Sequence, residues 1–414
     1  MLYREMLEAT RLTRAGRLSE ATALLQRILR GTAPDPANET ARESADTPPT
    51  DQPRIIDVTP DVIDVIHHQP SSAAGRASGP APSSPGKATG AGVRPYLPGT
   101  LRNLLERIKS GLGSVRPSAV PVADIAPEGG RFIEGSYGNH AGIRSYKLYI
   151  PSGYHGQALP LIVMLHGCTQ SAEDFAAGTR MNVIAEERTY LVAYPEQSAA
   201  ANASRCWNWF RPSDQQRDQG EPSLIAGITR QVMRKYPVDA QRVYIAGLSA
   251  GGAAAAVMGM TYPDLYAAVG VHSGLACGVA SDLPSAFAAM RQGNGGISAA
   301  EQRERITPTI VFHGDCDTTV HPRNGDHVIA QSKITTSMQT EVHHGRVPGG
   351  HSYTRTLYTD VGGPAILERW DIHGAGHAWS GGSLSGSYTD PRGPDATREM
   401  LRFFLDHPRP IAVP

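Results

Sequence analysis

The sequence predicts an α/β fold in which a mostly parallel central sheet carries helices on both faces. Short apolar runs rich in β-branched residues alternate along the chain with longer segments of helical periodicity. Several of these runs are apolar throughout, as strands buried on both faces are. A glycine-rich turn at 247–252 joins one such run to a segment rich in helix formers. Together these three observations indicate strand–helix–strand units in one sheet.

The elements are expected in alternating order. Residues 143–150 alternate apolar and polar side chains and predict an antiparallel strand. Buried strands are expected at 161–165, 190–194, 242–246, 267–272, 309–313 and 366–372. Helices are expected at 175–187, 224–236, 253–260 and 397–406.

The first third of the chain has a different character. Residues 1–31 carry two apolar rows at helical spacing and predict a helical hairpin that resembles one tetratricopeptide unit. The alternative is a marginally stable leader segment with no special role. Residues 32–129 predict a disordered Pro/Ala/Ser-rich linker with a short helix near 100–112. A large folded domain is then expected at 130–410.

Composition excludes several classes of function. Lys plus Arg and Asp plus Glu both number 39 among 414 residues, so there is no charge excess for binding nucleic acid or a membrane surface. No apolar run is long enough to span a membrane, and the N-terminus does not look like a secretory signal, so we expect a cytoplasmic protein. The four cysteines lack metal-site spacing, so no metal is expected. No organic cofactor is expected either.

The central motif is the segment Gly-Leu-Ser-Ala-Gly-Gly at 247–252, between a predicted strand and a predicted helix. In a nucleophile elbow this layout bends the backbone sharply and lifts a serine hydroxyl clear of the sheet. Small residues on both sides leave room for the bend. We therefore expect Ser249 to be a nucleophile; the alternative is a glycine-rich turn with an incidental serine.

A serine hydroxyl needs a base, and in α/β hydrolases the acid and then the histidine follow the serine in the chain. The acid is expected in the loop after the strand at 309–313, where Asp317 is preferred to Asp315, the latter being assigned to capping the turn. The histidine is expected to be His377, in a glycine-rich loop, with His373 as the alternative.

The oxyanion hole requires two backbone N–H groups directed at the developing negative charge. One is expected from Ala250, the residue after the nucleophile. The other is expected from Cys168, in the His-Gly-Cys-Thr loop that follows the strand at 161–165. A cysteine nucleophile is disfavoured because Ser249 already has an ordered set of partners.

Several motifs in the same order resemble the polyhydroxybutyrate depolymerase family of esterases. They are Leu-His-Gly-Cys-Thr-Gln at 165–170, Gly-Thr-Arg-Met-Asn at 178–182, Tyr-Pro-Glu-Gln at 194–197, Cys-Trp-Asn-Trp-Phe at 206–210, the elbow, and residues 373–382. The resemblance covers about 130–407. It implies an α/β-hydrolase fold and hydrolysis of short-chain 3-hydroxyalkanoate esters, and relatives include feruloyl and acetylxylan esterases.

The resemblance also suggests how the site is built. Trp207 and Trp209 are candidates for substrate binding in an apolar acyl pocket, with core packing as the alternative for each, and His166 is a third candidate. Cys168 and Cys206 could form a disulfide, which a cytoplasmic location would disfavour. The chain departs from secreted depolymerases in showing neither a signal peptide nor a polymer-binding domain after the catalytic one.

The main hypothesis is a serine esterase acting on a polyester, an oligoester or a small ester. A feruloyl, acetylxylan or general short-acyl esterase is the alternative, and a serine peptidase on the same fold is disfavoured because no charged cluster is seen for a peptide terminus. A third hypothesis is a non-enzymatic binder, in which the N-terminal segment tethers the domain to a polymer granule or protein partner.

Overall fold

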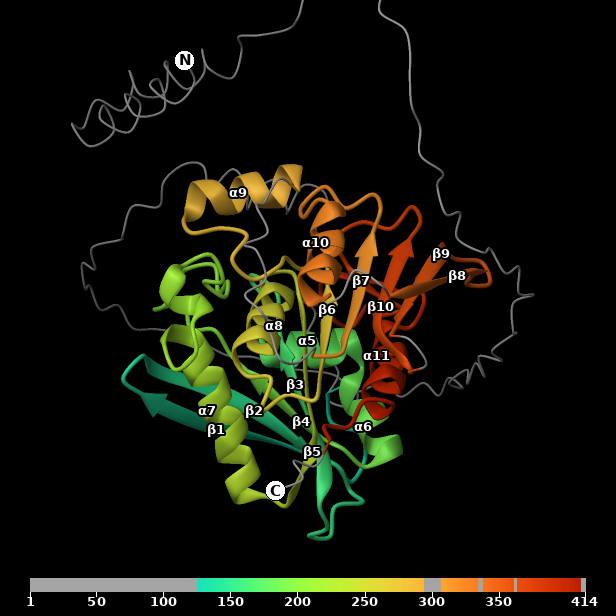
Figure 1. The fold of residues 1–414 in the computed structure, drawn as a ribbon. Helices are drawn as coiled ribbons and strands as arrows, with labels where there is room; N and C mark the ends of the chain where they lie inside the picture. The colour runs from blue at the N-terminus through green and yellow to red at the C-terminus, as the bar shows by residue number, and fades with distance from the viewer. Residues whose placement is uncertain (1–124, 294–306, 334–337, 361–362, 411–414) are drawn as a thin grey trace, which may run out of the picture. The chain divides into compact units, whose positions relative to one another are not determined.

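The computed structural model describes residues 125–293, 307–333, 338–360 and 363–410. The predicted hairpin at 1–31 and the predicted linker up to 124 lie outside the described residues. Within these ranges one sheet of ten strands has the order β1-β2-β4-β3-β5-β6-β7-β10-β9-β8 (Figure 1). The strands are β1 (Arg131–Asn139), β2 (Gly142–Ile150), β3 (Leu159–Leu165), β4 (Leu191–Pro195), β5 (Val238–Leu248), β6 (Ala268–His272), β7 (Thr309–Gly314), β8 (Gln339–Arg346), β9 (Ser352–Thr359) and β10 (Ala365–Ile372).

The centre of the sheet is parallel, from β4 through β3, β5, β6 and β7 to β10. Antiparallel hairpins extend both edges, β1–β2 on one side and β9–β8 on the other. The fold is therefore the α/β-hydrolase arrangement that the sequence predicts. The edge strands β1, β8 and β9 are not among the predicted elements because their residues are mostly polar or half-buried.

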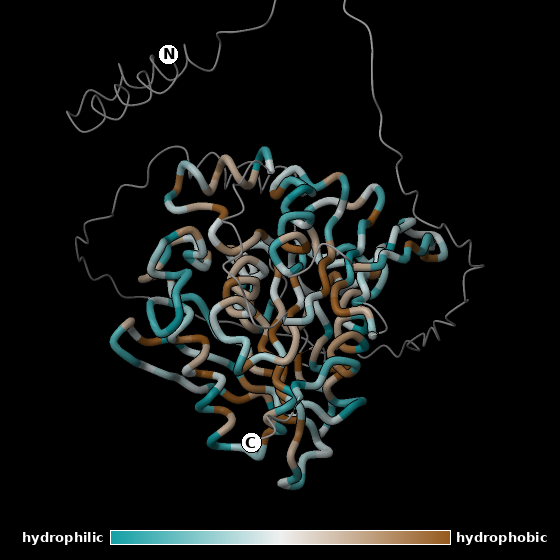
Figure 2. The backbone as a smooth tube through the Cα atoms, in the orientation of Figure 1, coloured by the Kyte–Doolittle hydropathy of each residue, from teal (hydrophilic) through white to brown (hydrophobic). Residues whose placement is uncertain are grey.

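Helices cover the two faces of the sheet. They are α5 (Ala172–Thr179), α6 (Met181–Arg188), α7 (Gly220–Lys235), α8 (Ala250–Thr261), α9 (Leu283–Gln292), α10 (Arg323–Ser332) and α11 (Ala396–Leu405), with a short 3-10 helix η1 (Pro212–Gln215). Alternate residues of a strand point to opposite faces. Thus Val163 and Ile245 join one core with α7 and α8, whereas Ile162 and Tyr244 join a second core with α5, α6 and α11. Figure 2 shows the hydrophobic segments concentrated in the central strands.

The helix predicted at 175–187 is wrong as a single element. Two helices, α5 and α6, meet at Arg180, which has φ 56° and ends one helix while beginning the next. The side chain of Thr179 donates to Phe175 O at 2.8 Å, and Gly178 packs so closely on Gly386 that no side chain fits between them. Contacts with a segment more than 200 residues away therefore decide where α5 ends.

The remaining boundaries follow the prediction more closely. Helix α7 begins at Gly220, four residues before the predicted start, and α9 and α10 are not among the predicted helices. Among the residues that the structure describes, no helix has both the length and the apolar character needed to cross a membrane. The loops after β3, β5, β7 and β10 leave the same edge of the sheet, where ligands bind in open α/β folds.

Candidate active site

Ser249 occupies a sharp turn between β5 and α8. Its backbone has φ 58° and ψ −120°, a conformation that non-glycine residues adopt only when the surrounding structure holds it. Its N–H donates to His272 O at 2.9 Å, which fixes the turn against β6. A Cβ at Gly251 would overlap Leu165 O, and one at Gly247 would overlap the Gly251 backbone. The two glycines are therefore required for the close approach of the turn to its neighbours, as the elbow prediction expects.

Asp317 and His377 are hydrogen-bonded to each other. The Nδ1 atom of His377 lies 2.7 Å from Asp317 Oδ2. The other carboxylate oxygen accepts the N–H groups of Thr319 and Val320, both at 2.8 Å, so Asp317 also closes its own turn. The carboxylate is consequently held in one orientation, with one oxygen left for the histidine.

A second imidazole stands beside the same carboxylate. His313, fully buried at the end of β7, has its Nε2 atom 2.9 Å from Val320 O and 3.5 Å from Asp317 Oδ2. Burial by itself would raise the pKa of Asp317, but the charge of His377 and the hydrogen bonds from both histidines bring that pKa well below its usual range. Asp317 is therefore a carboxylate throughout the neutral pH range.

Asp315 makes a parallel but separate pair. Its Oδ2 atom lies 3.0 Å from His373 Nδ1, and its Oδ1 atom accepts the Gly374 N–H at 2.7 Å. The expectation that Asp315 caps its own turn is wrong, because Asp317 does so. The two pairs are distinguished by environment: the Asp315 and His373 side chains are both 43% exposed, whereas Asp317 is buried next to the elbow.

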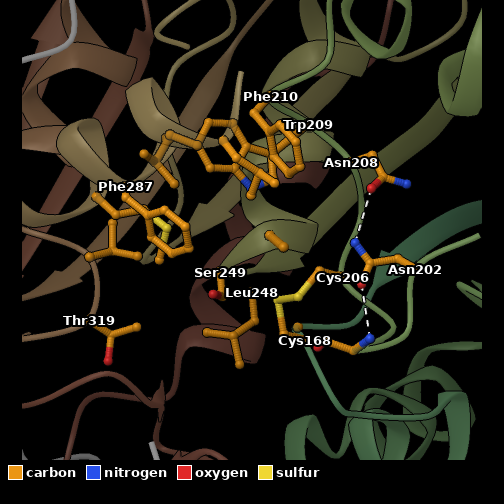
Figure 3. A pocket seen from close by; sticks show the side chains of 18 of the residues that line it. Cys168, Asn202, Cys206, Asn208, Trp209, Phe210, Leu248, Ser249, Phe287 and Thr319 are labelled. Carbon is orange, nitrogen blue, oxygen red and sulfur yellow. Dashed lines mark hydrogen bonds between the residues drawn. A yellow bond between two sulfur atoms is a disulfide. The ribbon is translucent and has the colours of Figure 1, made fainter. Parts of the chain in front are cut away.

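Ser249 and His377 line one cavity of about 330 Å³. Its wall is largely apolar and includes Trp209, Phe210 and Phe287 (Figure 3). Within the described part of the chain, neither the Ser249 hydroxyl nor His377 Nε2 has a hydrogen-bond partner. Both groups are thus available to a ligand in this cavity, while Asp317 reaches it through His377.

Cys168 and Ala250 also line the cavity. Ala250 is the first residue of α8, where the N–H group has no partner within the helix. The Cys168 N–H has no partner among the described residues. Both residues that the sequence predicts for the oxyanion hole therefore line the cavity that Ser249 also lines.

A disulfide joins Cys168 to Cys206. It links the loop after β3 to the loop that carries Trp209 and Phe210, and Thr169 N–H donates to Ser204 O at 2.8 Å beside it. The structure thus contains the Cys168–Cys206 pair that the sequence left open. In Figure 3, Ser249 is seen between the disulfide and Phe287.

Two of the three expected substrate-binding residues lie beneath the cavity. Trp207 is completely buried and its Nε1 donates to His166 O at 3.1 Å; His166 is also buried, and neither lines the cavity. Trp207 therefore follows the core-packing alternative, and Trp209 alone of the three reaches the cavity. Burial lowers the pKa of His166 to about 4, although the Gly167 carbonyl opposes the shift, so this ring is neutral.

The buried Glu221 side chain accepts hydrogen bonds from the loop that carries Trp209 and Phe210. Glu221, at the start of α7, accepts the Asn208 backbone and side-chain N–H groups, both at 2.7 Å, and a further hydrogen bond from Gln197 Nε2. The Gln197 N–H in turn donates to His166 Nε2 at 3.1 Å. The network therefore connects Glu221 to the loop that contains Cys168.

Sequence reasoning did not find several residues of the cavity wall, notably Phe287 and Met290 of α9, Val320 and Tyr388. A signal for α9 was present: Asp282 precedes apolar residues at 283, 286, 287 and 290, an N-cap followed by a helical stripe. No group of three or more metal-ligating side chains occurs among the described residues.

Comparison with known proteins shows which family this chain resembles. Residues 144–340 match the family described as Esterase PHB depolymerase. Over this stretch the chain is similar to the PHB depolymerase family of esterases. Members of this family and their relatives are carboxylic ester hydrolases of the α/β-hydrolase type, and they include both depolymerases and carbohydrate esterases.

Two curated relatives illustrate that range. Poly(3-hydroxyalkanoate) depolymerase C of Paucimonas lemoignei is 30% identical over 255 residues, which is 58% of this chain and 60% of the relative. Feruloyl esterase B of Neurospora crassa is 28% identical over 240 residues, 54% of this chain and 80% of the relative. An acetyl xylan esterase from Aspergillus awamori has a similar fold, with a TM-score of 0.52 at 19% identity, covering 67% of this chain and 99% of that one.

Proposed function

We propose that this chain is a serine esterase that hydrolyses short-chain 3-hydroxyalkanoate esters, as polymer or oligomer, with Ser249, His377 and Asp317 as its catalytic triad. The observation that carries the proposal is the juxtaposition of these residues: a buried Asp317 bonded to His377 Nδ1, and His377 sharing an apolar cavity with Ser249. Similarity to depolymerase C supports the substrate class. The chain spans only 60% of that relative, so the substrate itself is part of the proposal.

Each group has a defined role in the proposed reaction. His377 Nε2 takes the proton from Ser249 Oγ as this oxygen attacks the ester carbonyl carbon. Asp317 keeps the other ring nitrogen protonated and stabilises the positively charged imidazolium that forms. The N–H groups of Cys168 and Ala250 bind the oxyanion of the tetrahedral intermediate.

The intermediate then breaks down in the forward direction. The C–O bond to the leaving alkoxide breaks, and His377 donates its proton to that oxygen, leaving an acyl-enzyme on Ser249. A water molecule enters, His377 takes its proton, and the resulting hydroxide attacks the acyl carbon. Release of the acid returns the proton to Ser249 and restores the free enzyme.

The test measures 3-hydroxybutyrate release from amorphous poly(3-hydroxybutyrate) granules and hydrolysis of short p-nitrophenyl esters. Both reactions are expected with the wild type and neither with Ser249→Ala, because removal of a triad nucleophile costs roughly 10⁶ in kcat. Wild-type turnover in Ser249→Ala would contradict the triad. Activity on the small esters alone would keep the mechanism and reject the polymer.

A carbohydrate esterase is the second candidate, favoured by similarity to the feruloyl esterase and to probable acetylxylan esterases of Aspergillus. Release of ferulate or acetate from xylan faster than release of 3-hydroxybutyrate from its oligomers would select this candidate. The triad would be unchanged, because the same chemistry cleaves both kinds of ester.

We also propose that the enzyme is cytoplasmic. In this setting residues 1–98 would tether the catalytic domain to a polymer granule. Deletion of residues 1–98 is expected to abolish granule co-sedimentation and to leave turnover of a soluble ester intact. Co-sedimentation of the truncated chain would reject the tether.

A further inference from the structure

Among the described residues, Arg211 is the one side chain of fixed charge on the wall of the cavity that Ser249 lines. No aspartate, glutamate or lysine of the described ranges lines this cavity, and the other lining side chains are aromatic, aliphatic or polar and uncharged, apart from His377. A charge next to apolar surface is screened less than a charge in bulk water. The wall therefore favours a ligand that carries a negative charge.

The guanidinium group of Arg211 is not engaged by the protein. Within the described ranges it forms no hydrogen bond and no ion pair, and the residue is exposed. By contrast, the exposed Arg217 and Arg398 each hold a carboxylate through two hydrogen bonds. This paired geometry is the one in which an arginine fork recognises a carboxylate. Arg211 keeps the same capacity for a ligand.

The backbone that carries Arg211 is held in place. The Arg211 N–H donates to Asn208 O at 2.9 Å, and Asn208 in turn donates two hydrogen bonds to the buried Glu221. The disulfide at Cys206 fixes the same loop to the loop after β3. Only the Arg211 side chain itself has to be ordered when a ligand binds, which limits the entropy lost on binding.

Two carboxylates near Arg211 do not neutralise it. Arg211 also borders a second, polar cavity, which Asp214 and Glu221 line as well. Both acids are buried, and Asp214 Oδ1 already accepts the Glu221 N–H at 2.7 Å. Burial raises the pKa of Asp214, and the charge of Arg211 opposes this shift without forming an ion pair. The guanidinium group therefore remains open to a carboxylate that a substrate supplies.

The proposed substrates carry a charge of the required sign. An oligomer of 3-hydroxybutyrate ends in a free carboxyl group, which is ionised at neutral pH because the pKa of such groups is about 4. In the ester bond nearest that end, the carboxylate belongs to the unit whose oxygen leaves, and a short carbon spacer separates the two. An ester bond in the interior of a long polymer has no charge beside it.

We propose that Arg211 binds the terminal carboxylate of 3-hydroxyalkanoate oligomers and so directs Ser249 to the ester bond next to that terminus. This inference rests on the proposed esterase function and adds a preference for anionic oligomers over uncharged esters of the same length. The contact is made before the acyl-enzyme forms, because the carboxylate departs with the leaving alcohol unit. Arg211 therefore acts on substrate binding and acylation, and not on hydrolysis of the acyl-enzyme.

The test compares the linear dimer of 3-hydroxybutyrate with its terminal carboxamide, which has the same shape and no charge. The readout is the ratio of the two kcat/KM values for cleavage of the internal ester, carboxylate over carboxamide. Arg211→Gln removes the charge, and Arg211→Lys keeps the charge but loses the planar fork. Arg205→Gln removes the charge of an exposed arginine that precedes Cys206 and lines neither cavity, so it is the matched control. The melting temperature of each variant is recorded to identify loss of folding.

The wild-type ratio is expected to exceed one, because a charge-assisted hydrogen bond forms only with the carboxylate. Arg211→Gln is expected to lower the ratio about tenfold, Arg211→Lys to give an intermediate value, and Arg205→Gln to leave the ratio within about twofold. Added salt should lower the wild-type ratio and leave that of Arg211→Gln unchanged.

Two further outcomes separate this inference from the proposed function. Equal ratios in the wild type and Arg211→Gln, or an equal loss in Arg205→Gln, would overturn the carboxylate site while cleavage of the dimers leaves the esterase intact. Failure of the wild type to cleave either dimer would overturn the proposed function, and the carboxylate site with it.

Discussion

The Asp317 carboxylate holds the His377 ring through a bond of 2.7 Å to Nδ1. Two residues earlier Asp315 holds His373 through the same ring atom at 3.0 Å. The chain therefore contains two aspartate–histidine pairs of the same chemistry, one buried beside the elbow and one exposed. The duplication provides an internal control for the role of the buried pair.

Asp317→Asn is expected to reduce kcat/KM for short p-nitrophenyl esters by roughly 10³–10⁴-fold, because an amide no longer enforces the proton on His377 Nδ1. The equivalent change Asp315→Asn is expected to alter kcat/KM by less than about threefold. Steady-state kinetics of both variants, with melting temperatures to confirm folding, checks this. A larger loss in Asp315→Asn would mean that the exposed pair is the catalytic one.

Loss of the Cys168–Cys206 bond is expected to weaken both folding and catalysis. Cross-linking positions 38 residues apart contributes about 4 kcal/mol to the free energy of unfolding in the chain-entropy account. The bond also positions Cys168 N–H relative to Ser249. Cys206→Ser should therefore lower the urea midpoint and kcat together, whereas Cys316→Ser, which changes an exposed free thiol, should lower neither.

Thiol titration provides the corresponding chemical measurement. The denatured, unreduced wild type should expose two thiols, those of Cys277 and Cys316, and four after reduction. Four thiols without reduction would show that the bond does not form where the protein is made. The same titration on native lysate also tests the proposed cytoplasmic location, where cysteines are usually kept reduced.

His166 is expected to make folding sensitive to mild acid. Burial, the main cause, lowers its pKa from 6.5 to about 4, so between these values the unfolded chain binds more protons than the folded one. The free energy of unfolding should then fall with decreasing pH over this window, by about 1.4 kcal/mol per pH unit for one proton. In His166→Gln the slope of unfolding free energy against pH should be smaller, by up to about 1.4 kcal/mol per pH unit, because one titrating group is removed.

The measurement is urea unfolding at several pH values between 4 and 7. His155→Gln, at an exposed position, is the control and should keep the wild-type slope. His272 is buried as well and contributes equally to all three proteins, so the difference between slopes isolates His166. An unchanged slope in His166→Gln would contradict the prediction that burial of His166 makes the free energy of unfolding depend on pH.

Glu221 is expected to stabilise the aromatic wall of the cavity. Glu221→Gln places an NH₂ group against donors from Asn208 and Gln197, and loss of a buried acceptor of this kind costs about 3 kcal/mol of unfolding free energy. Because Asn208 adjoins Trp209, KM should rise more than kcat falls. Glu134→Gln, at a mostly exposed ion pair with Lys147, should change neither stability nor KM; equal effects of the two substitutions would argue against the network.

The sequence was most informative where a function depends on a few neighbouring residues. The elbow around Ser249 could be predicted because a strand, a turn and a helix must follow one another within about twenty residues, and small side chains are required at fixed positions. The alternating order of strands and helices likewise predicts the parallel sheet, since apolar periodicity is a local property. The pairs of candidates, Asp315 with Asp317 and His373 with His377, could also be found from their loops.

Which candidates act together was decided by the tertiary structure. Asp317 meets His377 across 60 residues of chain because β7 and β10 are adjacent in the sheet, an arrangement that local periodicity does not specify. The assignment of Trp207 to the core and Trp209 to the cavity, and the placement of α9 as the facing wall, depend on packing between segments distant in sequence. Local chemistry therefore determined the reactive groups, whereas long-range packing determined the space in which a substrate meets them.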